Sequence, residues 1–199
     1  MLNLQLTRTD EYEEVYLQLP ATPAEIGERW AWLDEFSDDV ASTRIVGAIS
    51  DVWNISQYLK NANVNDSEQM KKLNYIGEII NMLDRDECRL LEGALDAESV
   101  NSLDDVIAIG ERLDQYLLIP NVTNNRELGI RLVNYGVKPF DESVQPYLDY
   151  ARIGVEYYSD HGGAYIAGGY VVKRNSVEQT LIDVAQAYSE QENRGIQMG

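Results

Sequence analysis

The sequence predicts an α+β protein of three small domains followed by a C-terminal helix. Apolar and polar residues alternate near the N-terminus, a helical period fills the middle, and glycines separate two short strand-like runs further on. These observations divide the chain into an N-terminal α+β domain at residues 1–62, an acidic helical domain at 63–115, a second α+β domain at 116–175 and a helical extension at 176–199.

The N-terminal domain begins with a predicted β-hairpin. Six apolar residues alternate with polar ones on either side of an acidic loop at residues 10–14: Leu2, Leu4, Leu6, Val15, Leu17 and Leu19. The segment from Thr22 to Glu25 combines an N-cap, a proline at the first helical position and a capping-box glutamate, and it predicts a helix at 23–36. A third strand at 42–49 and a short helix at 54–59 complete this domain.

Three helices are predicted in the middle domain, where apolar residues recur with the helical period from residue 66 onward. Their apolar stripes are Met70, Leu73, Ile76, Ile80 and Leu83; then Cys88, Leu91 and Leu95; then Leu103, Val106, Ile107 and Leu113. Ser102 is the expected N-cap of the third helix. The acidic run at 84–87 lacks the glycine and the twelve-residue spacing of a calcium loop, so Asp84 indicates a helix cap rather than a metal site.

The third domain combines short strands with two helical segments. A strand at 116–119 is followed by a turn at 120–121, a helix at 124–134 closed by Gly136, a loop at 139–146 and a further segment at 147–158. Glycine pairs between residues 161 and 173 separate two short strands. Behind a capping box that starts at Ser176, a last helix carries an apolar stripe of Val177, Leu181, Val184 and Tyr188 that needs a partner.

Charge is distributed very unevenly along the chain, whose formal net charge is −18. Residues 1–60 contain 11 acids and 4 bases, residues 61–115 contain 13 and 5, and residues 116–175 contain 6 and 6. Since duplex DNA has one negative charge per ~1.7 Å of axis, the 24 carboxylates of the first 115 residues match about 40 Å of duplex. Such a surface repels nucleic acid and attracts cationic protein grooves, although acidic surfaces also serve simply to keep proteins in solution.

Composition excludes several classes of protein. No apolar run approaches the ~18 residues of a membrane span, and the N-terminus lacks the layout of a signal peptide, so we expect a soluble cytoplasmic protein. A single cysteine, Cys88, excludes an internal disulfide, and with the single histidine, His161, it cannot form a structural zinc site.

No catalytic or cofactor-binding signature occurs, so we expect neither an enzyme nor a bound cofactor or metal. The glycine pairs at 162–163 and 168–169 lack the strand–loop–helix context of a nucleotide loop, and His161 has no nucleophile in an identifiable motif. Trp30, Trp32 and Trp53 stand among acidic residues, which favours core or interface anchors over a platform for stacking bases, because such platforms need neighbouring Lys and Arg.

Three segments together resemble the ArdA antirestriction family. They are Lys72-Leu-Asn-Tyr-Ile-Gly-Glu-Ile-Ile-Asn-Met-Leu-Asp84 with the acidic residues after it, Asn124-Asn-Arg-Glu-Leu-Gly-Ile-Arg-Leu-Val133, and Pro146-Tyr-Leu-Asp-Tyr-Ala-Arg-Ile-Gly154 with the run from Gly162 to Val171. None of these is a catalytic signature, and it is their order and spacing over residues 64–172 that carries the resemblance.

The resemblance implies an elongated three-domain homodimer from a mobile element, such as a conjugative plasmid or transposon. Its acidic surface would mimic B-form DNA and occupy the DNA groove of type I restriction-modification enzymes, with no direct binding of nucleic acid. The expected DNA-mimic surface consists of Asp34, Glu35, Asp38, Asp39, Glu68, Glu78, Asp84, Asp86, Glu87, Glu92, Asp96, Glu98, Asp104, Asp105 and Glu111.

The charge-balanced residues 116–175 are the expected site of dimerisation, because two copies can meet there without strong repulsion. Tyrosines suit such interfaces, since the ring is apolar and its hydroxyl is polar. The candidate interface residues are Tyr147, Tyr150, Tyr157, Tyr165 and Tyr170.

Two other functions compete with DNA mimicry. An acidic interaction module that sequesters another basic or DNA-binding protein would show the same charge without DNA-like spacing. A carboxylate-dependent hydrolase would need a deep pocket in which two acids converge with raised pKa values.

Overall fold

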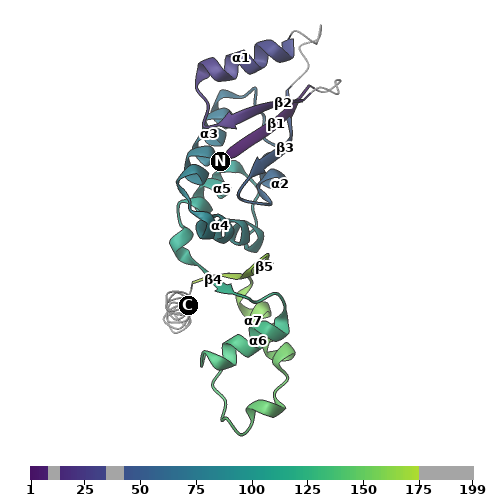
Figure 1. Cartoon of the computed structure of the whole chain (residues 1–199), viewed down its shortest axis with the longest axis vertical. Coiled ribbons are helices and arrows are strands. Elements are labelled where there is room, and N and C mark those ends of the chain that lie inside the picture. Colours follow the sequence, from purple (N-terminus) through teal and green to yellow (C-terminus); the bar gives the residue numbers. More distant parts are fainter. Residues whose placement is uncertain (9–13, 35–42, 175–199) are drawn as a thin grey trace, which may run out of the picture. The chain divides into compact units, whose positions relative to one another are not determined.

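The computed structural model describes residues 1–8, 14–34 and 43–174 (Figure 1). It confirms the α+β class, with helices and two three-stranded antiparallel sheets. The chain forms two compact units. Unit 1 comprises Met1–Leu95 and Ser99–Leu113, and unit 2 comprises Asp96–Glu98 and the chain from Asp114 onward.

The sheet of unit 1 contains the predicted N-terminal hairpin. Its strands are β1 (Leu2–Thr7), β2 (Glu14–Leu19) and β3 (Arg44–Ser50), in the order β2-β1-β3. Leu4 lies opposite Leu17 on β2 and Ala48 on β3, and the alternating leucines of both hairpin strands are buried. The predicted hairpin of half-buried strands is therefore confirmed, and its register matters because a shift by one residue would place these leucines on the solvent side.

Five helices accompany this sheet in the described part of the chain. They are α1 (Pro23–Asp34), α2 (Ile55–Leu59), α3 (Ser67–Met82), α4 (Arg85–Ala97) and α5 (Leu103–Gly110). Polar side chains start α1 and α5 as predicted: Thr22 and Glu25 bond reciprocally ahead of α1, and the Asp105 N–H donates to Ser102 Oγ at α5. Asn54 precedes α2 without a side-chain capping hydrogen bond. Leu83 ends α3 with an extended backbone, so the apolar stripe of α3 stops at its C-cap.

Unit 1 packs α3 against the sheet. The Ala21 N–H donates to Asn74 Oδ1 and the Asn74 amide donates to the Ala21 carbonyl, both at 2.9 Å, which fixes the end of the hairpin on α3. A side chain at Gly77 would meet Leu19, so helix and strand approach closely there. Residues of the predicted first and second domains thus share one compact unit, and their division at residue 62 stays a prediction.

In the residues that the structure describes, unit 2 contains the second sheet, two α-helices and two short 3-10 helices. The strands are β4 (Tyr116–Pro120), β5 (Ala164–Ile166) and β6 (Gly169–Lys173), and the α-helices are α6 (Asn125–Asn134) and α7 (Tyr150–His161). The 3-10 helices are η1 (Leu113–Gln115), whose first residue is counted with unit 1, and η2 (Gln145–Tyr147). The strand order is β4-β6-β5, with antiparallel pairing throughout. Asn121 (φ 57°) and Gly168 (φ 114°) occupy turns at the ends of paired strands, where a positive φ is needed. Asp149 caps α7 by accepting from the Arg152 N–H, so this helix begins at Tyr150 within the segment expected at 147–158.

The core of unit 2 lies between α6, α7 and the sheet. A Cβ added at Gly129 would meet the Tyr150 carbonyl oxygen, and one added at Gly154 would meet the Asn125 carbonyl oxygen. The two helices therefore cross in backbone contact. Leu128, Leu132, Ile153, Tyr157 and Tyr170 fill the space beneath them.

Some predicted elements lie outside the described residues. These are most of the acidic loop at 10–14, the end of the first helix at 35–36, the start of the third strand at 42, and the helical extension at 176–199 with its capping box.

Candidate functional site

The main concentration of predicted functional residues lies on three helices of unit 1. We define the acidic surface as Glu68 and Glu78 of α3, Asp84 before α4, Asp86, Glu87 and Glu92 of α4, Asp104 and Asp105 of α5, and Glu111 after α5. Glu92 and Asp105 are half-buried and the other seven are exposed. Unit 1 as a whole contains 21 acids and nine bases, so the charge predicted for the first 115 residues resides largely in one compact unit.

Helix capping fixes several of these carboxylates in place. Asp84 Oδ1 accepts from the backbone N–H groups of Asp86 (2.8 Å) and Glu87 (2.9 Å), and Glu87 Oε2 accepts in return from the Asp84 N–H (2.9 Å). This is a reciprocal capping box, which confirms the interpretation of Asp84 as a cap. The helix dipole also stabilises anions at a helix N-terminus. The capping hydrogen bonds and the dipole together explain how the carboxylates of Asp84 and Glu87 can lie close to one another.

At α5 Ser102 is the cap, accepting from the Asp105 N–H at 3.2 Å, and the Asp105 carboxylate bonds back to the residues at the start of the helix. Asp105 Oδ2 accepts from the Asn101 N–H at 3.0 Å and from Ser102 Oγ at 2.9 Å. These hydrogen bonds, the one from Asn101 first, hold the pKa of Asp105 below its ordinary value. Asp105 therefore remains ionised across the neutral range.

Three carboxylates of the acidic surface make ion pairs within unit 1. Lys71 pairs with Glu68 at 2.5 Å, Lys72 with Asp104 at 2.6 Å, and Arg89 with Asp86 at 3.3 Å. The carboxylate partners are 67–80% exposed, so each pair is screened by water and contributes little stability. Because acids exceed bases in this unit, pairing leaves a large negative excess.

Several residues expected on the mimic surface are placed elsewhere or not described. Asp96 and Glu98 belong to unit 2. Glu98 Oε1 accepts from Lys173 Nζ and Tyr116 Oη, both at 2.9 Å, so its charge is paired within a local cluster of unit 2. Glu35, Asp38, Asp39 and the side chain of Asp34 lie outside the described residues.

The candidate interface tyrosines divide into buried and accessible rings. Tyr157 and Tyr170 are 1% and 0% exposed in the core of unit 2, which corrects the expectation for both, because their rings pack inside the fold. Tyr147 is 87% exposed, whereas Tyr150 and Tyr165 are half-buried. Their hydroxyls donate to the Gln145 carbonyl (2.9 Å) and to Asn125 Oδ1 (2.6 Å), and burial raises the pKa of Tyr165 to about 12.

Exposed apolar side chains that sequence reasoning missed lie on α7. Val155 is 49% and Tyr158 44% exposed. Ile153 and Tyr157, four residues apart, are buried, and this spacing is the signal that could have assigned Val155 to the opposite face of the helix. The Tyr158 ring instead lies beside the core, with its centroid 6.1 Å from that of Tyr165 and 6.5 Å from that of Tyr170. Unit 2 thus exposes Val155, part of Tyr158 and Tyr147.

The tryptophans show a similar division. Trp53, next to α2, is 85% exposed, and Ile49 on β3 is 59% exposed. Trp30 on α1 is half-buried. It lines a cavity of about 400 Å³ together with Met70 of α3 and Val64.

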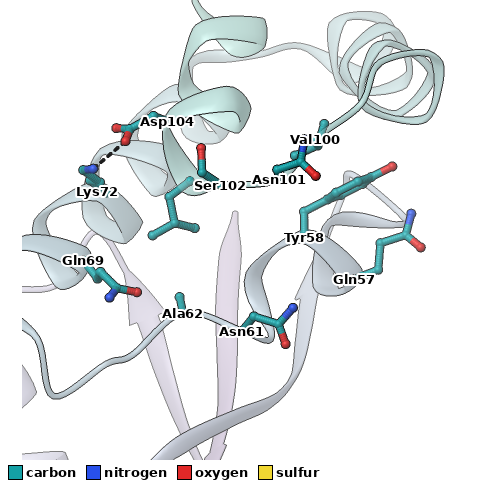
Figure 2. A pocket seen from close by; sticks show the side chains of 11 residues that line it. Gln57, Tyr58, Asn61, Ala62, Gln69, Lys72, Val100, Asn101, Ser102 and Asp104 are labelled. Carbon is teal, nitrogen blue, oxygen red and sulfur yellow. Dashed lines mark hydrogen bonds and ion pairs between the residues drawn. The ribbon is translucent and has the colours of Figure 1, made fainter.

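A second cavity of unit 1 lies between α2, α3 and the N-terminal end of α5, and its volume is about 360 Å³ (Figure 2). Carboxamide side chains dominate its lining, together with Tyr58 and the Lys72–Asp104 ion pair. Asp104 is the single carboxylate that lines either of these two cavities, so neither provides the converging pair of acids that a hydrolase would need.

The remaining chemical groups are structurally engaged. His161 Nδ1 lies 3.0 Å from the Tyr157 carbonyl oxygen and its ring stacks on Tyr157 at 4.1 Å. Cys88 is buried on the apolar face of α4, and burial raises the pKa of its thiol. Within residues 1–8, 14–34 and 43–174, no three or more His, Cys, Asp or Glu side chains gather in a way that could bind a metal ion. In the same residues no helix has both the length and the apolar character to cross a membrane.

No family model matches the sequence, and no curated protein matches it.

Proposed function

We propose that this chain is an antirestriction protein, a non-enzymatic DNA mimic that binds the DNA groove of type I restriction-modification enzymes in the cytoplasm. The observation that carries the proposal is the acidic surface of α3, α4 and α5, where nine carboxylates gather in one compact unit, seven of them exposed. The resemblance of residues 64–172 to the ArdA family supports the choice of target. An origin on a mobile element belongs to the same proposal.

The mechanism is competitive occupancy. Carboxylates of the acidic surface take the positions of DNA phosphates against Lys and Arg of the enzyme, so the enzyme cannot hold its DNA. The capping interactions of Asp84, Glu87 and Asp105 support this mechanism, because they fix the charges to rigid helix ends instead of leaving them on free side chains.

The proposal also includes a homodimer formed through unit 2. Residues 116–175 contain six acids and six bases, so two copies can approach without net repulsion. The exposed Tyr147, Val155 and Tyr158 supply apolar area of the kind that interfaces bury.

A competition experiment tests the proposal. A purified type I methyltransferase core is bound to its labelled cognate duplex, and the full-length chain is added. We expect displacement of DNA at near-stoichiometric protein. The variant Asp84→Asn, Asp86→Asn, Glu87→Gln, Glu92→Gln should lose most of this activity, whereas each single change should have a weak effect, because the summed field matters more than one charge.

A control variant carries the same change of charge outside the acidic surface: Asp114→Asn, Glu142→Gln, Asp149→Asn, Asp160→Asn. It should inhibit like the wild type. If the wild type failed to displace DNA at large excess, the restriction enzyme would not be the target. Capture of a different DNA-binding protein by the same surface would then favour the acidic interaction module.

A further inference from the structure

The cavity between α2, α3 and α5 has a lining that suits a guanidinium group. Four carboxamide residues contribute to it, and Figure 2 places Gln57 and Tyr58 on the opposite side from Lys72 and Asp104. The carboxamides are Gln57, Asn61, Gln69 and Asn101. Gln69 Oε1 already accepts from the Asn63 N–H and its amide donates to Asp66, so the acceptors that carry the argument are the Asp104 carboxylate with Asn61 and Asn101. Carboxamide and carboxylate oxygens accept hydrogen bonds, and a guanidinium offers five donors in a planar fork.

A lysine of the chain already occupies one side of this cavity. Lys72 Nζ lies 2.6 Å from Asp104 Oδ2, and the side chains are 38% and 67% exposed, so this ion pair lines the cavity in contact with water. The cavity wall therefore binds a positive charge in the free protein. A guest cation with more donors than an ammonium group can replace Lys72 at Asp104, because Lys72 has a long flexible stem and can move out into water.

Three further features favour a cation over other ligands. Unit 1 contains 12 more acids than bases, so an anionic ligand is repelled. The N-terminal end of α5 carries a partial positive charge, but Asp104 and Asp105 in its first turn outweigh it with full negative charges. Tyr58 adds an aromatic ring to the lining, and guanidinium groups bind such rings better than neutral polar groups do.

We propose that this cavity is an arginine receptor: it binds the guanidinium of a protein arginine, with Asp104 as the charged acceptor and Lys72 as a built-in competitor. The identity of that arginine rests on the proposed function, since a DNA-binding groove presents arginines to phosphate. The acidic surface would then attract the enzyme through its summed charge, and the cavity would fix the orientation of the bound enzyme by holding one arginine.

The first test uses L-argininamide and the ¹⁵N-labelled full-length chain at low salt, followed by NMR. We expect saturable shifts of the side-chain amides of Asn61, Gln69 and Asn101. The variant Asp104→Asn should weaken binding roughly tenfold, and Lys72→Met should strengthen it several-fold by removing the competitor. L-lysinamide should bind more weakly than L-argininamide.

The control is Glu78→Gln, which makes the same change of charge on α3 outside the cavity. It should leave the affinity for L-argininamide within about twofold of the wild type. The arginine receptor is wrong if L-argininamide causes no saturable shift, if Asp104→Asn and Glu78→Gln weaken binding equally, or if L-lysinamide binds as well.

The same variants separate this inference from the proposed function. In the competition experiment, Asp104→Asn should weaken displacement of DNA more than Glu78→Gln does. If the wild type displaces DNA and the two variants weaken displacement equally, the enzyme does not bind through the cavity, and the proposal of DNA mimicry is unaffected. Absence of any displacement by the wild type would overturn the proposed function, and the NMR titration would still decide whether the cavity binds arginine.

Discussion

At the scale of single residues, two glycines decide how unit 2 packs. Gly129 of α6 and Gly154 of α7 each stand where a methyl group would collide with a backbone carbonyl oxygen of the other helix. A carbonyl at a helix crossing cannot move aside as the end of a flexible side chain can. The absence of a side chain at these positions is therefore a requirement of the fold, independent of any function.

We predict that Gly129→Ala or Gly154→Ala lowers the free energy of unfolding of unit 2 by about 2 kcal/mol or more, because the helices must separate. Gly27→Ala on α1 is the matched control, since nothing lies within 4 Å of the new methyl group, and it should stabilise unit 1 by about 0.5–1 kcal/mol. Urea unfolding followed by circular dichroism measures both. Similar behaviour of all three variants would contradict the backbone contact between α6 and α7.

Glu98 makes the free energy of unfolding of unit 2 depend on pH in the acidic range. The hydrogen bond from Lys173 and then that from Tyr116 hold the pKa of Glu98 below its ordinary value of 4.5. A carboxyl whose pKa is depressed in the folded state stabilises the fold above its unfolded pKa and loses that contribution as the pH falls through the folded pKa.

We therefore predict that the wild type loses more stability than Glu98→Gln between about pH 5 and pH 3. Urea unfolding at each pH gives the comparison. The exposed Glu142→Gln serves as the control and should follow the wild type. Parallel curves for the wild type and Glu98→Gln would show that the Glu98–Lys173 pair has no energetic role.

At the scale of elements, helix caps connect the fold with the charge. Asp66 caps α3, Asp84 and Glu87 cap α4, and Ser102 with Asp105 caps α5. Each helix needs an acceptor at its N-terminus, and here that acceptor is in most cases a carboxylate. Capping alone explains the positions of these acids, whether or not they bind a partner. An experiment therefore has to distinguish their role in capping from a role in binding a basic partner.

Amide substitutions achieve this separation, because asparagine caps a helix about as well as aspartate. We predict that Asp84→Asn keeps the thermal stability of unit 1, whereas Asp84→Ala lowers its free energy of unfolding by about 1 kcal/mol. Differential scanning calorimetry distinguishes the two. If Asp84→Asn were as unstable as Asp84→Ala, unfolding would explain a loss of inhibition by the fourfold variant that carries Asp84→Asn, and the loss would not demonstrate a role for charge.

The elements that local pattern determines were predicted correctly. The alternating leucines from Leu2 to Leu19 and the capping signals at Thr22, Asp84 and Ser102 involve residues close in sequence, and the structure confirms the hairpin and the helices. The burial of Tyr157 and Tyr170 depends on how α6, α7 and the sheet pack into one core, and a tyrosine suits a protein interior as well as an interface, so its type alone does not predict which.

Long-range contacts at the candidate site are what the sequence could not indicate. Glu98 bonds to Lys173, 75 residues away, and counting charges along the sequence does not detect such a pair. The cavity lined by Tyr58, Lys72 and Asp104 joins three separate segments of the sequence, so no single motif could indicate it.

At the scale of the whole molecule, charge is divided between the two units. Unit 1 carries 21 acids and nine bases with its acidic surface on α3, α4 and α5, and residues 116–175 of unit 2 are balanced. Both units expose apolar side chains, such as Trp53 in unit 1 and Tyr147 in unit 2, so charge distinguishes the two units and apolar exposure does not.

We predict that the double variant Val155→Glu, Tyr158→Glu converts a dimer into a monomer, because both side chains are exposed on one helix and burying two carboxylates at an interface is unfavourable. Sedimentation velocity measures the mass. Ala108→Glu, on the exposed side of α5, is the control and should remain dimeric. A dimer that survives the double variant, or that depends on residues 1–60, would contradict assembly through unit 2.

The salt dependence of inhibition tests the central claim most directly. The affinity of the full-length chain for a type I methyltransferase core is measured from about 50 to 200 mM salt, beside that of the cognate duplex. DNA mimicry predicts that the logarithm of affinity falls linearly with the logarithm of salt concentration for both ligands, and less steeply for the variant neutralised at Asp84, Asp86, Glu87 and Glu92. An affinity that is independent of salt, or an equal slope for the neutralised variant, would contradict the account.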